Sequence, residues 1–403
     1  MLTKLRLLVV LLGGQLLAPV VGADQHGNPT VAFLTLNPNP AFAEVQKGVL
    51  DSLLAYGFID SEERATLELG QAFEGENINI IWGESDSDFA SVNLVIENVL
   101  DQQPDVLIPL TTPITQIAIN ATLDLDHPPA VLFAFVYNPY EAGIARSSCI
   151  KPDHVTGAES FISYEDVLSL LVMQDPDLDT VGVLYDSSGM VGALGAAHIA
   201  ALGAEMGLSV EQAAVTDFAD LRLATEGLFG KGVDALVLPP DITVSHGLPV
   251  VVTVANENNK PIFHASFGSF FVGATVSTGF YRYYKQGADV GSVLVAHLNG
   301  DIDIAATAIN LSTSTGVGVN VDAAAAQEVE IVDELMEQAY MVMVEGQVSF
   351  GPTIGPADAD AYFADYAELD LEARMAADAE LLASLQCSPE MIAEQQAELD
   401  AAE

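Results

Sequence analysis

The stretch DVLIPLTTPITQIAI, residues 105–119, decides the fold of this chain. An apolar run typical of a buried strand stops at two threonines and a proline, and apolar residues at helical spacing follow. Threonine is a fair helix N-cap and proline suits the first helical position, so Thr111, Thr112 and Pro113 predict the start of a helix. A strand that feeds a helix is also where open α/β sheets bind ligands. Capping and ligand binding therefore stand as two interpretations of Thr111 and Thr112.

The same succession of strands and helices occurs twice along the chain. We expect the first copy to have strands at 31–36, 78–82, 105–110 and 129–136, and helices at 41–56 and from Asp88 to about Leu100. We expect the second to have strands at 181–185, 208–215, 234–239 and 261–266, and helices at 191–206 and from Asp217. The spacing from Asp88 to Asp217 equals that from Asp105 to Asp234, 129 residues in both cases. This alternation predicts an α/β fold of two similar, doubly wound parallel-sheet lobes that face each other.

Polar and aromatic residues follow the expected strands in both copies. In an open parallel sheet the ligand crevice lies at the carboxyl ends of the strands. Helices that begin there offer free N–H groups and a partial positive charge, which suit a carboxylate or a phosphate. Two facing sets predict a cleft that closes on a small molecule by a hinge. The candidate ligand-binding residues at these ends are Asn39, Thr111, Thr112, Tyr137, Asn138, Asp186, Ser187, Ser188, Asp241, Thr243, Ser266 and Phe267.

The aromatic run FYRYYKQG, residues 280–287, holds two of the few basic residues, Arg282 and Lys285. One interpretation is a helix start whose rings pack on one face. The other places Arg282 or Tyr281 at the rim of the cleft, where a guanidinium would hold a ligand carboxylate through two hydrogen bonds. Arg282 is therefore a further candidate for ligand binding.

The chain carries 57 acidic and 12 basic residues, for a formal net charge of −45. Such a surface repels nucleic acid and anionic membrane faces, so we expect neither as a partner. One interpretation of the charge is solvation of the protein in salty water, and the alternative is an electric field that steers cations.

The first 23 residues have the features of a cleavable secretory signal. Lys4 and Arg6 precede an apolar stretch from Leu7 to Val21, and small residues end at Ala23. Cleavage there leaves a formal charge of −47 and no cysteine for a lipid anchor, so we expect a periplasmic protein. That oxidising compartment permits a disulfide, and we hypothesise that Cys149 and Cys387 pair and pin the C-terminal tail to the body.

Sequence signatures of catalysis are missing. The chain has no G-x-S-x-G nucleophile elbow, no P-loop and no full dinucleotide fingerprint. Its seven histidines are scattered and do not have the spacing of metal ligands. We therefore expect no enzyme activity, no cofactor and no metal.

Several stretches together resemble the ABC-transporter substrate-binding proteins of the type I periplasmic fold, in the branch that binds tryptophan and other aromatic amino acids. The similar stretches include AFAEVQKGVLDSLLAYGF (41–58), HVTGAES (154–160), DTVGVLYDSSG (179–189), DALVLPPDITVSHG (234–247) and YYKQGADVGSVLVAHLNGD (283–301). The resemblance covers about residues 30 to 345. Relatives often have Asp after the PIF strand, where this chain has Ser266, so Asp186 or Asp241 would take its place beside a ligand amine.

The resemblance implies two lobes joined by crossover strands, a clamped solute, an ABC permease in the inner membrane as partner, and no catalysis. We expect lobe 1 at 24–150 plus 273–311, lobe 2 at 151–272 plus 312–345, and a monomer. A ligand sensor that presents its closed form to a membrane receptor is the alternative function. The tail at 346–403 is acidic and helical by propensity. Its apolar stripe, at Tyr362, Phe363, Tyr366 and Leu369, would pack on the body or form a partner-binding helix.

Overall fold

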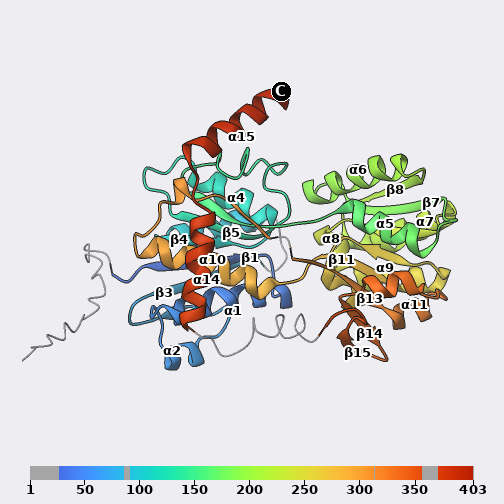
Figure 1. Cartoon of the computed structure of the whole chain (residues 1–403), viewed down its shortest axis with the longest axis horizontal. Helices are drawn as coiled ribbons and strands as arrows, with labels where there is room; N and C mark the ends of the chain where they lie inside the picture. Colours follow the sequence, from blue (N-terminus) through green and yellow to red (C-terminus); the bar gives the residue numbers. More distant parts are fainter. Residues whose placement is uncertain (1–26, 86–90, 313, 356–370, 403) are drawn as a thin grey trace, which may run out of the picture.

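The computed structural model describes residues 27–85, 91–312, 314–355 and 371–402, and it contains two α/β lobes side by side (Figure 1). The sheet of lobe 1 has the strand order β12-β6-β5-β4-β1-β3-β2, and that of lobe 2 has the order β15-β14-β13-β11-β10-β9-β7-β8. The parallel parts, β3-β1-β4-β5-β6 and β8-β7-β9-β10-β11, have the same order. The predicted duplication and fold class are confirmed.

Lobe 1 holds β1 and β3 to β6 as parallel strands, together with β12 and the antiparallel edge strand β2. Its strands are β1 Thr30–Thr35, β2 Phe73–Glu74, β3 Asn79–Glu84, β4 Val106–Pro109, β5 Ala130–Val136, β6 Val155–Ser160 and β12 Asn310–Ser312. Its helices are α1 Pro40–Ala55, α2 Ser61–Thr66, α3 Val92–Leu100, α4 Thr112–Thr122, α10 Tyr283–Leu298 and the short η3 Ile304–Ala306. The expected start of a helix at Asp88 lies outside the described residues.

Lobe 2 repeats the plan and adds an antiparallel strand and a hairpin. Its strands are β7 Thr180–Asp186, β8 Ser209–Val215, β9 Ala235–Leu238, β10 Ile262–His264, β11 Val276–Phe280, β13 Thr315–Asn320, β14 Met341–Val344 and β15 Gln347–Phe350. Its helices are α5 Tyr164–Gln174, α6 Met190–Glu205, η1 Phe218–Asp220, α7 Leu221–Gly230, α8 Ile242–His246, α9 Leu248–Asn258, η2 Phe267–Val272, α11 Val321–Ala326 and α12 Asp333–Gln338. The strands expected in both copies lie within about two residues of these bounds.

The chain crosses between the lobes three times within the described core, after β6, after β11 and after β12. The expected lobe boundaries need correction for this reason. The boundary at residue 150 comes before β6, which pairs with β5 in lobe 1. The segment expected in lobe 1 from residue 273 includes β11, which pairs with β10 in lobe 2. Strand β15, expected in the tail, pairs with β14 of lobe 2. The lobe to which a strand belongs is set by the strands with which it pairs, and the periodicity of the sequence does not show which strands pair.

Helices cover both faces of each sheet, as alternation of side chains along a strand requires. Val31 and Phe33 of β1 pack with α1 and α10 in one core, and Ala32 and Leu34 pack with α3 and α4 in the other. Helices α1 and α10 cross very closely. A Cβ atom at Gly48 would lie 2.2 Å from the carbonyl oxygen of Tyr284, so this crossing requires glycine.

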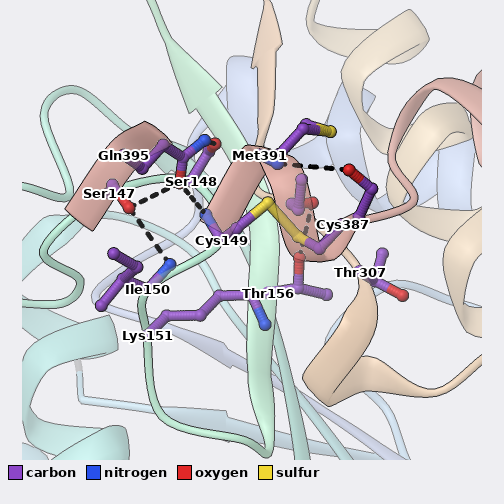
Figure 2. Close-up of a disulfide and its surroundings, with 12 residues drawn as sticks. Ser147, Ser148, Cys149, Ile150, Lys151, Thr156, Thr307, Cys387, Met391 and Gln395 are labelled. Atoms are coloured by element: carbon purple, nitrogen blue, oxygen red, sulfur yellow. Dashed lines mark hydrogen bonds between the residues drawn. A yellow bond between two sulfur atoms is a disulfide. The ribbon is translucent and has the colours of Figure 1, made fainter. Parts of the chain in front are cut away.

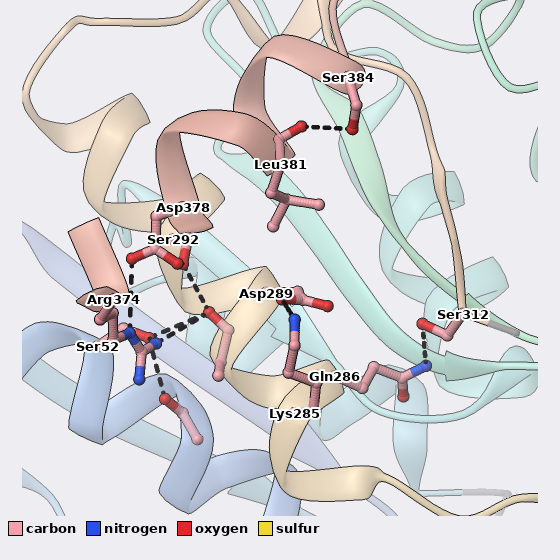
Figure 3. A network of polar contacts seen from close by, with 12 residues as sticks. Ser52, Lys285, Gln286, Asp289, Ser292, Ser312, Arg374, Asp378, Leu381 and Ser384 are labelled. Atoms are coloured by element: carbon pink, nitrogen blue, oxygen red, sulfur yellow. Dashed lines mark hydrogen bonds and ion pairs between the residues drawn. The ribbon is translucent and has the colours of Figure 1, made fainter. Parts of the chain in front are cut away.

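The C-terminal tail packs on lobe 1 through α14 Leu371–Ser384 and α15 Pro389–Ala402. Cys149 and Cys387 form a disulfide, which confirms their predicted pairing (Figure 2). Figure 3 shows Asp378 of α14 accepting a hydrogen bond from Ser292 at 2.7 Å and Arg374 donating to Ser52. The tail therefore belongs to the body of lobe 1. Its expected apolar stripe, Tyr362 to Leu369, lies outside the described residues.

Candidate functional site

A cavity of about 950 Å³ lies between the lobes, at the carboxyl ends of their strands. In lobe 1, α1 follows β1 and α4 follows β4, which is the next strand in the sheet, and the two helices lie on opposite faces. In lobe 2, α6 follows β7 and α8 follows β9 in the same way. Both are topological switch points, where such sheets open a crevice. The starts of all four helices line the cavity.

The structure at the start of α4 bears on whether Thr111 and Thr112 serve as a helix cap or are available to a ligand. Thr111 occupies the N-cap position, but its side chain makes no capping hydrogen bond, and its backbone φ is +88°. The hydroxyl oxygens of Thr111 and Thr112 are buried and have no hydrogen-bond partner in the described part of the chain. Capping therefore does not explain these hydroxyls. Two buried hydroxyls without a partner cost stability, and a polar ligand in the adjacent cavity would offset that cost.

Asp186 and Asp241 join the ends of β7 and β9 in lobe 2. Asp241 Oδ2 accepts a hydrogen bond from the Asp186 N–H at 2.8 Å, and Asp241 Oδ1 accepts one from the Val244 N–H at 2.9 Å. Asp186 Oδ1 accepts from the Ser188 hydroxyl at 2.6 Å, and Asp186 Oδ2 accepts from the Thr243 hydroxyl at 2.6 Å. Every carboxylate oxygen of this pair has a donor within the protein.

The pKa values of these two carboxyl groups shift in opposite directions. Burial raises the pKa of Asp241 and outweighs the N–H donors of Val244 and Asp186. Burial also acts to raise the pKa of Asp186, but the hydrogen bonds from Ser188 and Thr243 outweigh it and lower that pKa. Asp186 is therefore the more acidic member of the pair.

Aromatic rings from both lobes form another part of the wall. Phe135 stacks on Tyr283 at 5.1 Å between ring centroids, and Phe42 meets Phe135 edge-on at 5.1 Å. Strand β5 is irregular at Phe135, whose φ is +59° and whose N–H donates to the buried side chain of Gln286. Phe267 of lobe 2 also lines the cavity.

Glu44 contributes a third carboxylate to the wall. Its Oε1 accepts a hydrogen bond from Lys47 Nζ at 2.7 Å, and its Oε2 is buried without a hydrogen-bond partner among the described residues. Glu44 is four residues after Pro40, the first residue of α1, as Gln116 is four residues after Thr112 in α4. This spacing places each side chain on the same helix face as the first turn, a signal that could have predicted both residues.

Most of the residues predicted from strand ends come together at this cavity. Those that line it are Asn39, Thr111, Thr112, Tyr137, Asp186, Ser188, Asp241, Thr243, Ser266 and Phe267. Asn138, Ser187 and Arg282 are not among the lining residues. Asn138 instead caps a turn, where its side chain accepts from the N–H groups of Tyr140 and Glu141. The Ser187 hydroxyl donates to the carbonyl of Val215.

Arg282 is the N-cap residue of α10 and is not among the lining residues, whereas Tyr281, the alternative candidate, and Tyr283 line the cavity. Two of the four rings of the aromatic run therefore lie at the cleft, whereas Arg282 does not. Among the described residues that line the cavity, none is Lys or Arg.

The two lobes contact each other across the cleft. Asn37 of lobe 1 and His246 of lobe 2 lie 2.8 Å apart between Nδ2 and Nε2, and burial lowers the pKa of His246. Glu141 and His198 approach to 3.5 Å. Tyr137 hydrogen-bonds to Ser266 of the other lobe. The cavity thus has walls from both lobes that already touch at several points.

Comparison with known proteins gives a consistent result. Residues 39–343 match the family described as ABC transporter substrate binding protein. The tyrosine-binding protein of Clostridioides difficile (strain R20291) is 25% identical over 289 residues, covering 71% of this chain and 78% of that protein.

Two of the solved structures that are similar to this chain illustrate the shared fold. The ABC domain in complex with L-Trp from Streptococcus pneumonia has a TM-score of 0.68 and 23% identity, and covers 78% of this chain and 100% of its own. A conserved domain protein from Vibrio cholerae has a TM-score of 0.69 and 22% identity, with the same coverage. At these identities the structures show the fold alone.

The described residues contain neither a cluster of metal ligands nor a helix suited to cross a membrane. No group of three or more His, Cys, Asp and Glu side chains there is arranged to hold a metal ion. No helix in that part of the chain has both the length and the apolar composition to cross a membrane.

Proposed function

The chain belongs to the family of ABC transporter substrate-binding proteins, and from this premise we propose that it is the extracytoplasmic solute-binding protein of an ABC importer. It binds an amino acid between its lobes and performs no catalysis. The observation that carries this proposal is the cavity between the lobes, where two buried threonine hydroxyls at the start of α4 have no partner in the described part of the chain.

The ligand is an amino acid with an aromatic side chain. Its carboxylate binds at the start of α4, where free N–H groups, the helix dipole and the hydroxyls of Thr111 and Thr112 favour negative charge. Its ring stacks among Tyr137, Phe267 and the other aromatic side chains of the wall. The names of two relatives, one tyrosine-binding and one solved with L-Trp, support this class of ligand.

Binding is coupled to a hinge motion of the lobes. Three chain crossings within residues 27–350 connect them, and the contacts Asn37–His246 and Tyr137–Ser266 span the cleft. Contacts of this kind form as the cleft closes on a ligand and break as it opens. The closed form is then presented to the permease.

The protein works as a monomer in the periplasm after removal of residues 1–23. Its partners are the solute and an ABC permease in the inner membrane, and its strongly negative charge opposes binding to nucleic acid.

A ligand screen on protein stripped of bound solute tests this function. The mature protein would be unfolded, refolded and heated with amino acids, other small carboxylates, nucleosides and sugars. A ligand at one hundred times its dissociation constant stabilises the folded state by about 2.7 kcal/mol, which appears as a higher melting temperature. We expect the largest shifts with L-Trp, L-Tyr and L-Phe. A shift confined to sugars or nucleosides would contradict the proposal.

A further inference from the structure

The cavity has an unusual balance of charge for a site that would bind a carboxylate. Glu44, Asp186 and Asp241 all line it, and no Lys or Arg stands among its described lining residues. Its one lining histidine, His246, has a pKa that burial lowers, so it stays neutral at pH 7. A purely anionic ligand would meet helix N-termini but also three carboxylates, of which Glu44 is paired with Lys47. This charge balance favours a ligand that brings positive charge of its own over a purely anionic one.

Two of the three carboxylates already have their donors. The oxygens of Asp186 accept from Ser188 and Thr243, and those of Asp241 accept from the backbone of Asp186 and Val244. These bonds hold the ends of β7 and β9 together. A ligand amine that bound here would compete with contacts that support lobe 2.

Glu44 differs from Asp186 and Asp241 because only one of its two carboxylate oxygens accepts a hydrogen bond from a described residue. Lys47 donates to Oε1, whereas Oε2 is buried without a hydrogen-bond partner among the described residues. A buried carboxylate oxygen without a donor costs free energy, and a charged donor would remove that cost. Glu44 also lies on α1, which starts across the lobe 1 switch point from Thr111 and Thr112. An α-amino acid carries both an ammonium and a carboxylate, so one ligand in the cavity can present a charged group to each of these two places.

We propose that Glu44 binds the ammonium group of the ligand and thereby restricts the site to amino acids against carboxylates that lack the amine. This assignment rests on the proposed function and deepens it. It replaces the expectation that Asp186 or Asp241 holds the amine.

Calorimetric titration of two variants against matched ligands tests the assignment. The ligands are L-tyrosine and L-tryptophan, each paired with its deamino analogue, 3-(4-hydroxyphenyl)propionate and 3-indolepropionate. The variants are Glu44→Gln and the control Glu97→Gln, which changes an exposed glutamate on α3 of the same lobe.

We expect the wild-type protein to bind an amino acid at least about tenfold more tightly than its analogue. Glu44→Gln should weaken amino-acid binding by about ten- to one-hundredfold, the range for a hydrogen bond to a charged group. Binding of the analogues should change less than about threefold, and Glu97→Gln should change neither. Equal losses for both members of a pair, or no loss for either, would overturn the assignment.

The titrations distinguish a failure of the assignment of Glu44 from a failure of the proposed function. Wild-type protein that binds neither amino acid refutes the proposed function, and the role of Glu44 falls with it. Wild-type protein that binds amino acids and analogues equally refutes the role of Glu44 alone. That comparison needs no variant, so it holds even if Glu44→Gln fails to fold.

Discussion

Gly192 lies directly against Asp241, and a Cβ atom at this glycine would be 1.8 Å from Asp241 Oδ2. Gly192 is in the first turn of α6, and Asp241 caps α8 while it accepts a hydrogen bond from the Asp186 N–H. The absence of a side chain on one helix thus makes room for the carboxylate that ties together the switch point of lobe 2.

Substitution of Gly192 by Ala should disturb this arrangement. The added methyl group displaces Asp241, and we expect a loss of about 1–3 kcal/mol in the free energy of unfolding, with weaker ligand binding. Chemical denaturation and calorimetry measure the two effects. Gly227→Ala in α7 is the control, since a Cβ atom there has nothing within 4 Å and should stabilise the helix. Equal behaviour of the two variants would show that the contact does not matter.

Substitution of Thr112 by Val should separate ligand binding from stability. Valine keeps the shape and removes a buried hydroxyl that has no partner in the described part of the chain. We expect ligand-free protein to be as stable as wild type or up to about 1 kcal/mol more stable, and ligand affinity to fall about tenfold. Thr115→Val is the counterpart, because the Thr115 hydroxyl donates to the Thr111 carbonyl at 2.8 Å. An unchanged affinity in Thr112→Val would remove this hydroxyl from the site.

Loss of the Cys149–Cys387 disulfide should destabilise the protein and leave the ligand site intact. The bond closes a loop across 238 residues and holds the tail on lobe 1. We expect a double Cys→Ser variant to lose about 2–4 kcal/mol and to bind ligand normally. Thermal unfolding with and without reductant is the measurement. Reductant should lower the melting temperature of the wild type alone; the same melting temperature in all four samples would contradict this.

His264 should make the protein sensitive to acid. It is fully buried, neither ring nitrogen has a partner in the described part of the chain, and burial lowers its pKa from 6.5 to about 3. Between these two pKa values, His264 binds a proton in the unfolded chain but not in the folded protein. The free energy of unfolding therefore falls as pH falls, by up to about 1.4 kcal/mol per pH unit.

The comparison of His264→Leu with wild type isolates this effect from other titrating groups. Urea unfolding at pH 7.5 and 4.5 should show a smaller loss of stability in the variant, by about 2–3 kcal/mol. His127→Gln, at an exposed position, should behave as wild type does. If the three proteins lose equal stability on acidification, His264 is not the acid-sensitive group.

The sequence alone was enough to predict the two lobes and the strand ends that contribute to the cavity wall. The spacing of apolar residues, the starts of helices and the turn residues can each be recognised within a short stretch of sequence. Polar residues also mark the strand ends, as at Thr111, Asp186 and Asp241. The equal spacing of 129 residues from Asp88 to Asp217 and from Asp105 to Asp234 identified the duplication. With only two cysteines in the chain, the pairing of Cys149 with Cys387 was also predictable.

Tertiary structure alone decided which groups are left without partners. Local pattern placed Thr111 at a helix start but did not show that its hydroxyl makes no cap. It predicted Arg282 or Tyr281 for the cleft, where Tyr281 and Tyr283 lie and Arg282 does not, and it missed Glu44. It also placed β6 and β11 in the wrong lobes, because strand pairing depends on contacts far along the chain. Periodicity reports whether a residue is buried, whereas the partner of a buried group is set by segments that fold against it from elsewhere.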